Sequence, residues 1–159
     1  MKSIELTSLV RIIGITLYFF IAAQGAFYHF GFGKALYNIP AEDFIVLRKA
    51  VDPIVRGKFK VLYLSALAVT FIWFLLSDKT AGFLSYAPVL IAFLLLVADM
   101  ALILKFSEPV NALINGSTLN TETGFNQARS EWLKFILIRG YLSISGFLLL
   151  MVHLVLRFR

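Results

Sequence analysis

The sequence predicts an all-α fold: an integral membrane four-helix bundle with an amphipathic interfacial helix between the first and second spans. Two observations lead to this fold class. The chain of 159 residues is 60% hydrophobic and only 15% charged, whereas a soluble domain is typically about 45–50% apolar and about 25% charged. The apolar residues also lie in long continuous blocks, which must be helical or form a closed barrel because lipid offers backbone groups no partner.

Four blocks are long enough, or nearly so, to cross a hydrocarbon layer roughly 30 Å thick, which takes about 20 residues. A membrane β-barrel would instead alternate polar and apolar residues over strands of about 10 residues. We therefore expect helices. They belong to a single transmembrane domain covering residues 1–159, and the spans are 9–32, 61–77, 83–106 and 132–156.

The first block has features of a secretory signal peptide, because Lys2 and Arg11 precede an apolar stretch. Its apolar run continues to Phe32, however, so we expect a retained helix. Four spans place both termini on the same side of a multi-pass protein. Five basic residues lie on the side of the termini and nine on the opposite side, so the positive-inside rule favours the opposite side as cytoplasmic.

The composition also excludes several kinds of metal site and partner. The absence of cysteine excludes thiolate metal sites and disulfides, and the two histidines are too few for a multi-histidine site. We therefore expect no metal and no cofactor. The net charge of +6 is not clustered with aromatic residues on a soluble surface, so we expect no nucleic acid. The expected partners are membrane lipids and a lipophilic small molecule, and homo-oligomerisation is left open.

The loop between the first two spans has the pattern of an amphipathic helix. It begins at Pro40, where a proline and two acids mark a first turn. Apolar and charged residues then occupy opposite faces, which is typical of a helix at the membrane surface. We expect a kink at Pro53 and an end at Gly57. A plain linker with a solvated charge run is the alternative.

The second long loop carries similar signals. Glu108 and Pro109 indicate a new helical turn, and the Asn115-Gly116 pair indicates its end. Thr121 or Thr123 is placed to cap an extension of the last helix.

Three ionisable residues fall within the predicted spans, where a charge is expensive: His29, Asp99 and Arg139. Asp99 lies seven residues before the end of the third span, and Arg139 lies seven residues after the start of the fourth. Both are therefore roughly 10 Å deep from the same face. Because they lie on consecutive antiparallel helices, we predict a buried ion pair. His29 lies about one turn inside the same face.

Further polar residues share faces with this group and are candidates for ligand binding: Tyr18, Asn111, Asn115, Trp132 and Ser143. Small residues between them permit close helix approach or leave room for a ligand. Each also has a structural interpretation. The ion pair can hold helices together, the asparagines can cap a helix, Ser143 can be a packing residue, and Trp132 can anchor the membrane interface.

In layout the chain resembles the anthrone-oxygenase-like family of small four-helix membrane proteins, most of which are uncharacterised. The motifs are GAFYHF at residues 25–30, LYNIP at 36–40, PVNALIN at 109–115, and Trp132 followed by Arg139. The family often has a second tryptophan or an asparagine shortly before that arginine, where this chain has Ile-Leu-Ile.

The resemblance implies an oxygenase or oxidoreductase that uses O₂ to oxidise an activated methylene of an aromatic or quinone-like substrate. Such a reaction needs a base for the proton and a cation for the developing oxyanion. His29 would be the base and Arg139 the cation, oriented by Asp99, in a site without a cofactor.

Two other classes of function remain open on the residues alone: a non-catalytic membrane subunit or lipid-binding partner, and a small transporter. An enzyme predicts a cavity lined by His29 and Arg139. A purely structural ion pair predicts close packing without a cavity, and a transporter predicts a polar path that reaches both faces.

Overall fold

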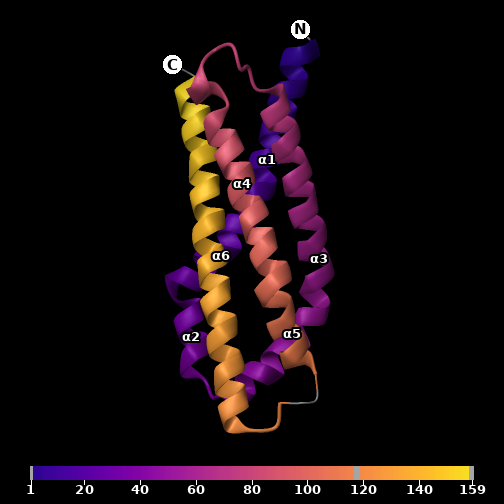
Figure 1. Ribbon diagram of the computed structural model, residues 1–159, viewed down its shortest axis with the longest axis vertical. Coiled ribbons are helices and arrows are strands. Elements are labelled where there is room, and N and C mark those ends of the chain that lie inside the picture. The colour runs from indigo at the N-terminus through magenta and orange to yellow at the C-terminus, as the bar shows by residue number, and fades with distance from the viewer. Residues whose placement is uncertain (1, 117–118, 158–159) are drawn as a thin grey trace.

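The computed structural model describes residues 2–116 and 119–157, with side chains described for 6–116 and 119–155. These residues form four long helical rods packed side by side (Figure 1). In chain order the elements are α1 Lys2–Phe27, π-helical turn η1 Tyr28–Phe32, α2 Gly33–Asn38, α3 Ala41–Leu76, 3-10 turn η2 Phe83–Ser85, α4 Ala87–Leu102, π-helical turn η3 Ile103–Ser107, α5 Glu108–Asn115 and α6 Glu122–Arg157.

Four stretches are long and apolar enough to cross a membrane, which makes this a multi-pass membrane protein with a four-helix bundle, as predicted. They are Leu6–Asn38, Ala41–Leu76, Ala87–Asn115 and Glu122–Val155. The start of α1 and the end of α6 lie at the same end of the bundle (Figure 1). Each helical rod continues past the apolar block at the opposite end, and this extra length carries much of the charge.

The first rod bends at Gly31. This glycine has a φ of 141°, which L side chains rarely adopt, and it lies inside the π-helical turn η1. After the bend, the short helix α2 lies beside α6 (Figure 1). The bend therefore displaces the end of the first rod from the line of α1.

The structure shows no separate interfacial helix between the first two spans. The charged segment is instead the first part of α3, which runs without interruption from Ala41 to Leu76. Pro53 is inside the helix, and the predicted end at Gly57 is wrong. The physical reason is packing. Phe44 is 0% exposed within an apolar cluster shared with α5 and α6, so one face of this segment packs into the bundle.

Other predicted helix boundaries at this end of the bundle are confirmed. Pro40 immediately precedes α3, and Gly116 follows α5. The backbone N–H of Gly124 donates to the hydroxyl of Thr121 at 3.2 Å, so Thr121 caps α6. These caps fix where the charged turns of α3, α5 and α6 begin.

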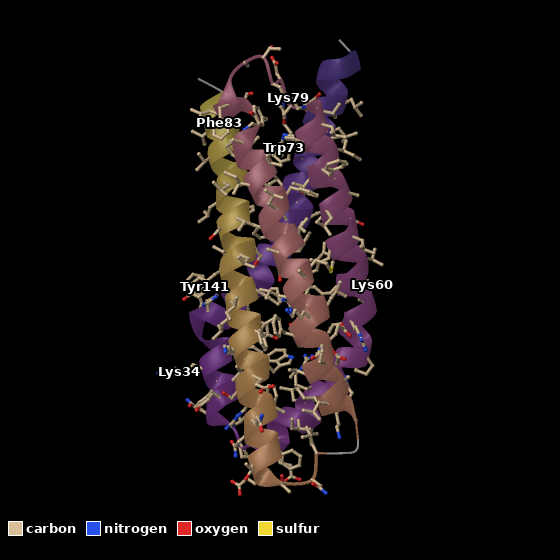
Figure 2. The ribbon with its side chains drawn as sticks, in the orientation of Figure 1. Lys34, Lys60, Trp73, Lys79, Phe83 and Tyr141 are labelled. Atoms are coloured by element: carbon tan, nitrogen blue, oxygen red, sulfur yellow. The ribbon has the colours of Figure 1, made fainter. Side chains whose placement is uncertain are left out.

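Two apolar clusters form the core, one in each half of the bundle. The cluster toward the termini includes Tyr18, Trp73 and Leu96, and the other includes Phe44, Ile114 and Trp132. Many large apolar side chains instead cover the outside of the rods, as a lipid-facing surface requires (Figure 2). The polar groups described next lie between and beside these two clusters.

Candidate functional site

The predicted contact between Asp99 and Arg139 is confirmed. Nε of Arg139 donates to Oδ1 of Asp99 at 2.7 Å, joining α6 to α4. Tyr63 of α3 completes the group, because its hydroxyl donates to Oδ2 of Asp99 at 2.7 Å and accepts from Nη2 of Arg139 at 3.0 Å. Asp99 is 0% exposed. Three helices thus meet at one charged group with fixed geometry.

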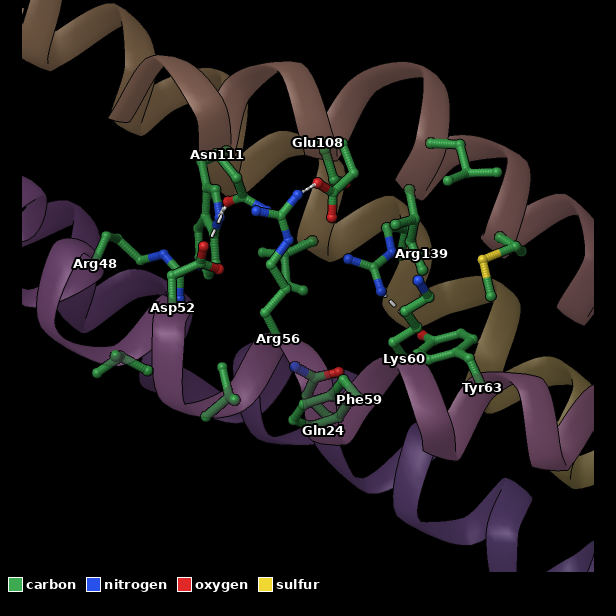
Figure 3. A pocket seen from close by; sticks show the side chains of 18 of the residues that line it. Gln24, Arg48, Asp52, Arg56, Phe59, Lys60, Tyr63, Glu108, Asn111 and Arg139 are labelled. Carbon is green, nitrogen blue, oxygen red and sulfur yellow. Dashed lines mark hydrogen bonds and ion pairs between the residues drawn. The ribbon is translucent and has the colours of Figure 1, made fainter. Parts of the chain in front are cut away.

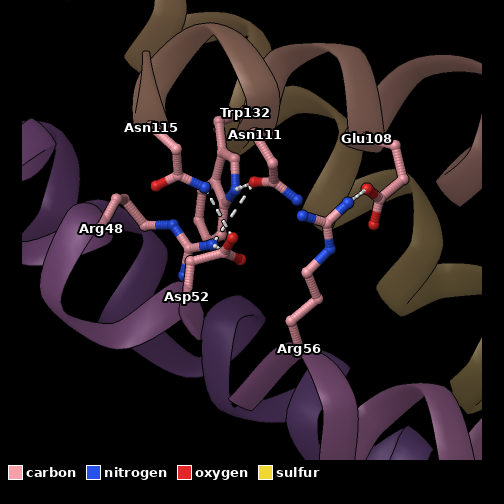
Figure 4. A network of polar contacts seen from close by, with 7 residues as sticks. All are labelled: Arg48, Asp52, Arg56, Glu108, Asn111, Asn115 and Trp132. Carbon is pink, nitrogen blue, oxygen red and sulfur yellow. Dashed lines mark hydrogen bonds and ion pairs between the residues drawn. The ribbon is translucent and has the colours of Figure 1, made fainter. Parts of the chain in front are cut away.

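A second polar network lies nearer the loops, where α3, α5 and the start of α6 meet (Figure 4). Arg48 donates to Asp52 at 2.9 Å and to Asn111 at 3.4 Å. The indole N–H of Trp132 donates to the same Asn111 oxygen at 3.0 Å, and Asn115 donates to Asp52 at 2.7 Å. The guanidinium of Arg48 also lies 4.4 Å from the centre of the Trp132 ring. The two helices α3 and α5 are therefore joined by hydrogen bonds inside the bundle.

Arg56 and Glu108 form a third ion pair, between the next turn of α3 and the start of α5 (Figure 4). Their side chains are 52% and 27% exposed, so this pair is much less buried than the other two. An exposed pair of this kind is typically worth about 0–1 kcal/mol.

A cavity of about 710 Å³ lies between these charged groups. Its lining comes from α1, η1, α3, α4, η3, α5 and α6, and most of its wall is apolar. Figure 3 shows Arg139 and Tyr63 toward one end and Arg48, Asp52 and Asn111 toward the other. The two ends are about 10 Å apart along α6, from Trp132 to Arg139. A volume of this size is within the range of about 300–1,000 Å³ found for small-molecule sites.

Two buried polar atoms of the cavity wall have no hydrogen-bond partner among the described residues. They are Nε of Arg48 and the hydroxyl oxygen of Ser107. Both residues line the cavity, and they are only 8% and 6% exposed. A buried donor that stays unpaired typically costs about 1–3 kcal/mol, but both atoms are themselves buried and neither is exposed to the cavity. Ser107 belongs to the π-helical turn η3, a distortion frequent at functional sites.

Three of the predicted site residues line this cavity: Asn111, Trp132 and Arg139. Asp99 lies behind them, held by Tyr63 and Arg139 and fully buried. Asn115 is tied to Asp52 and is not part of the lining. Around the cavity, the structure thus brings together the arginine, one asparagine and the tryptophan.

The other three predicted residues, Tyr18, His29 and Ser143, lie outside the lining. Tyr18 donates to the carbonyl oxygen of Ala92 at 2.9 Å in the opposite half of the core. Nε2 of His29 donates to the carbonyl oxygen of Leu137 at 2.9 Å. This cavity is therefore lined by Arg139 but not by His29.

Close helix packing explains why His29 and Ser143 lie apart from the cavity. A Cβ added to Gly25 would lie 2.6 Å from the Cα of Gly140, so α1 and α6 touch backbone to backbone. At Gly146 an added Cβ would lie 1.8 Å from the hydroxyl of Tyr18. The small residues on these faces therefore serve close approach and leave no room for a ligand.

Sequence reasoning missed the site residues of α3, namely Arg48, Asp52, Arg56 and Tyr63, whereas it placed Glu108 at the start of a helical turn. A signal was present: the first three follow one another at intervals of four, and Tyr63 comes seven residues later. These intervals define one face of a helix that continues through Gly57. Because a helix end was predicted at that glycine, Tyr63 was assigned to a different helix from the three other residues and the common face was missed.

No group of three or more metal-binding side chains occurs in the described parts of the chain. Comparison with protein-family models, with curated proteins and with solved structures finds no match to this chain. Function must therefore be argued from the fold and the site.

Proposed function

We propose that this membrane protein binds a lipophilic small molecule in the cavity between α1, α3, α5 and α6. The observation that carries the proposal is a largely apolar cavity of about 710 Å³ with a fixed guanidinium toward each end, Arg48 at one and Arg139 at the other. A ligand with an apolar body and an oxygen acceptor would match both the apolar wall and a guanidinium donor.

The fixed orientation of the surrounding groups supports binding of an oxygen at either end. Asp99 and Tyr63 hold Arg139, and Asp52 holds Arg48. A guanidinium held by a carboxylate loses little rotational freedom when it donates a further hydrogen bond, which favours selective binding.

An oxygenase acting on an aromatic or quinone-like substrate is the second candidate, and it rests on the resemblance to the anthrone-oxygenase-like family. Arg139 favours it, because a fixed guanidinium on the cavity wall can hold an oxyanion. Proton abstraction is less well supported. His29 is outside the lining, and the two carboxylates that line it, Asp52 and Glu108, each hold an arginine. The binding function therefore stands first, with catalysis as an added step.

The binding proposal can be tested with a matched pair of substitutions. Ile136 lines the cavity, whereas Ile138, on the same helix, is 38% exposed and is not part of the lining. Each is replaced by phenylalanine, the variants are purified in mild detergent, and co-extracted lipophiles are measured by native mass spectrometry. We expect Ile136→Phe to lose most of the bound species and Ile138→Phe to retain it.

Ser107→Ala is a second variant that keeps the proposal testable if Ile136→Phe does not fold. The Ser107 hydroxyl has no partner within the described protein, so its removal should not lower the melting temperature. Loss of a polar group from a residue that lines the cavity should still weaken retention of the ligand. Equal retention in all three variants would contradict the proposal. Uptake of O₂ with the added aromatic substrate, abolished in Arg139→Lys, would instead establish the second candidate.

A further inference from the structure

One side of the cavity wall consists of residues that are also exposed on the outside of the bundle. Leu64 of α3 is 52% exposed and Leu104 of η3 is 65% exposed, and both line the cavity. Lys60 lines it one turn before Leu64 and is exposed as well. Residues that belong to both surfaces mark the edge of an opening. This opening, between α3 and η3, is called the side opening below.

The surroundings of the side opening are those of a lipid-facing surface. Val61, next to Lys60 on α3, is 65% exposed, and Leu104 forms the edge across from it. In a soluble protein such a cluster of exposed aliphatic side chains would be unusual, but in a transmembrane bundle it faces acyl chains. A molecule dissolved in the bilayer can therefore reach the cavity without passing through water.

The charges of the cavity wall leave one cation unmatched. Arg48 is paired with Asp52, Arg56 with Glu108, and Arg139 with Asp99. Lys60 makes no hydrogen bond or ion pair with any described residue, although it lies at the side opening (Figures 2 and 3). A single unmatched ammonium favours a ligand with a single negative charge.

From this arrangement we propose that the ligand is a lipophilic monoanion, a carboxylate or phosphodiester on an apolar body, that enters sideways from the bilayer. Its anionic group meets Lys60 at the side opening, and its apolar body lies along the cavity toward Trp132. This proposal rests on the binding function proposed above and specifies the ligand class and the route.

The test uses the fluorescence of Trp132 and quenching by bromine, which requires contact. The chain has two tryptophans, and Trp73 is removed as Trp73→Phe, which breaks no hydrogen bond because its indole nitrogen has no described partner. Trp132 is only 6% exposed and lines the cavity. Bromine in the surrounding lipid is thus shielded from it, whereas bromine in a bound molecule can reach it.

The protein is reconstituted into vesicles of neutral lipid and titrated with dibrominated stearate, with the matching dibrominated alcohol, and with a brominated phosphatidylglycerol. We expect saturable quenching by an anion, with the neutral alcohol weaker by about three- to fivefold, the effect of one exposed charge pair. Quenching by the stearate alone identifies a free acid as the ligand, and quenching by the phospholipid identifies a bilayer lipid.

Lys60→Gln should weaken the anion to the level of the alcohol. Lys58→Gln is the matched control, because Lys58 is exposed on the same helix and does not line the cavity. Equal binding of acid and alcohol, or the same loss in both lysine variants, would overturn the charge assignment. Absence of quenching by every probe, with the co-purified species still lost in Ile136→Phe, would overturn the monoanion proposal and leave the binding function intact.

Discussion

The group formed by Asp99, Arg139 and Tyr63 makes a quantitative prediction about stability. Replacing Asp99 by leucine leaves the guanidinium of Arg139 with only the Tyr63 hydroxyl, and its side chain is just 12% exposed. Replacing Arg139 by methionine leaves a carboxylate that is 0% exposed with the same single partner. Each single substitution is expected to lower the free energy of unfolding by about 3–5 kcal/mol, because it strands a buried charge.

The double variant, Asp99→Leu with Arg139→Met, removes both charges and strands only the Tyr63 hydroxyl. An orphaned buried hydroxyl costs about 1–3 kcal/mol, so the double variant should be more stable than either single one. The sum of the single effects would exceed the double effect by about 3 kcal/mol or more. Adding Tyr63→Phe removes this hydroxyl, so the triple variant should regain the stability that the unpaired hydroxyl costs. Reversible unfolding in mixed micelles, followed by circular dichroism, measures all four variants.

If the double variant lost as much stability as the two single variants together, the reasoning would be refuted. The three side chains would then act independently, and the short distances between them would carry no energetic coupling. A triple variant less stable than the double one would show that Tyr63 has a role besides its contacts to the two charges.

Other predictions concern packing and the loop at the termini. Gly25→Ala should lower the free energy of unfolding by about 1–3 kcal/mol, because the added methyl group forces α1 away from α6. Gly57→Ala should raise it by about 0.5–1 kcal/mol, because the methyl group meets open space and alanine favours the helix. Thermal unfolding of both variants tests these two predictions. The hydroxyl and backbone N–H of Thr80 hold the pKa of the exposed Asp78 below its ordinary value. The stability that this contributes is present above the unfolded pKa and is lost as pH falls through the lower folded pKa. Thr80→Ala should raise the Asp78 pKa, which carboxyl NMR can follow; an unchanged titration would contradict this.

The sequence predicted the contact between Asp99 and Arg139 because depth in a helix depends only on counting residues. Two antiparallel neighbours with opposite charges at equal depth require no further information. It did not predict where His29 points, because direction around the helix depends on packing. The backbone contact at Gly25 and Gly140 sets that direction and turns His29 toward the carbonyl of Leu137.

The α3 segment was misinterpreted for a different reason. A helix with one apolar and one charged face is compatible with two environments, a membrane surface and the wall of a polar cavity. In the structure Phe44 and Arg48, four residues apart, lie on the same face and both contact Trp132, whereas Val46 and Ile54 are 62% and 64% exposed. The environment depends on contacts with α5 and α6. These helices are far away along the chain, so a pattern within the segment itself does not reveal the contacts.

Ion pairs alone do not account for the cavity. If Asp99 and Arg139 served only to fix the helix register, the bundle would be more stable with the helices packed closely around them. Atoms that line an empty space lose van der Waals contacts. Instead, the Asn111 and Trp132 network fixes the other end of the cavity, about 10 Å further along α6. Two rigid polar ends separated by an apolar space are costly unless something fills the space. The variants that fill it or remove its unpaired hydroxyl, Ile136→Phe and Ser107→Ala, therefore test the structural and the functional interpretation in one measurement.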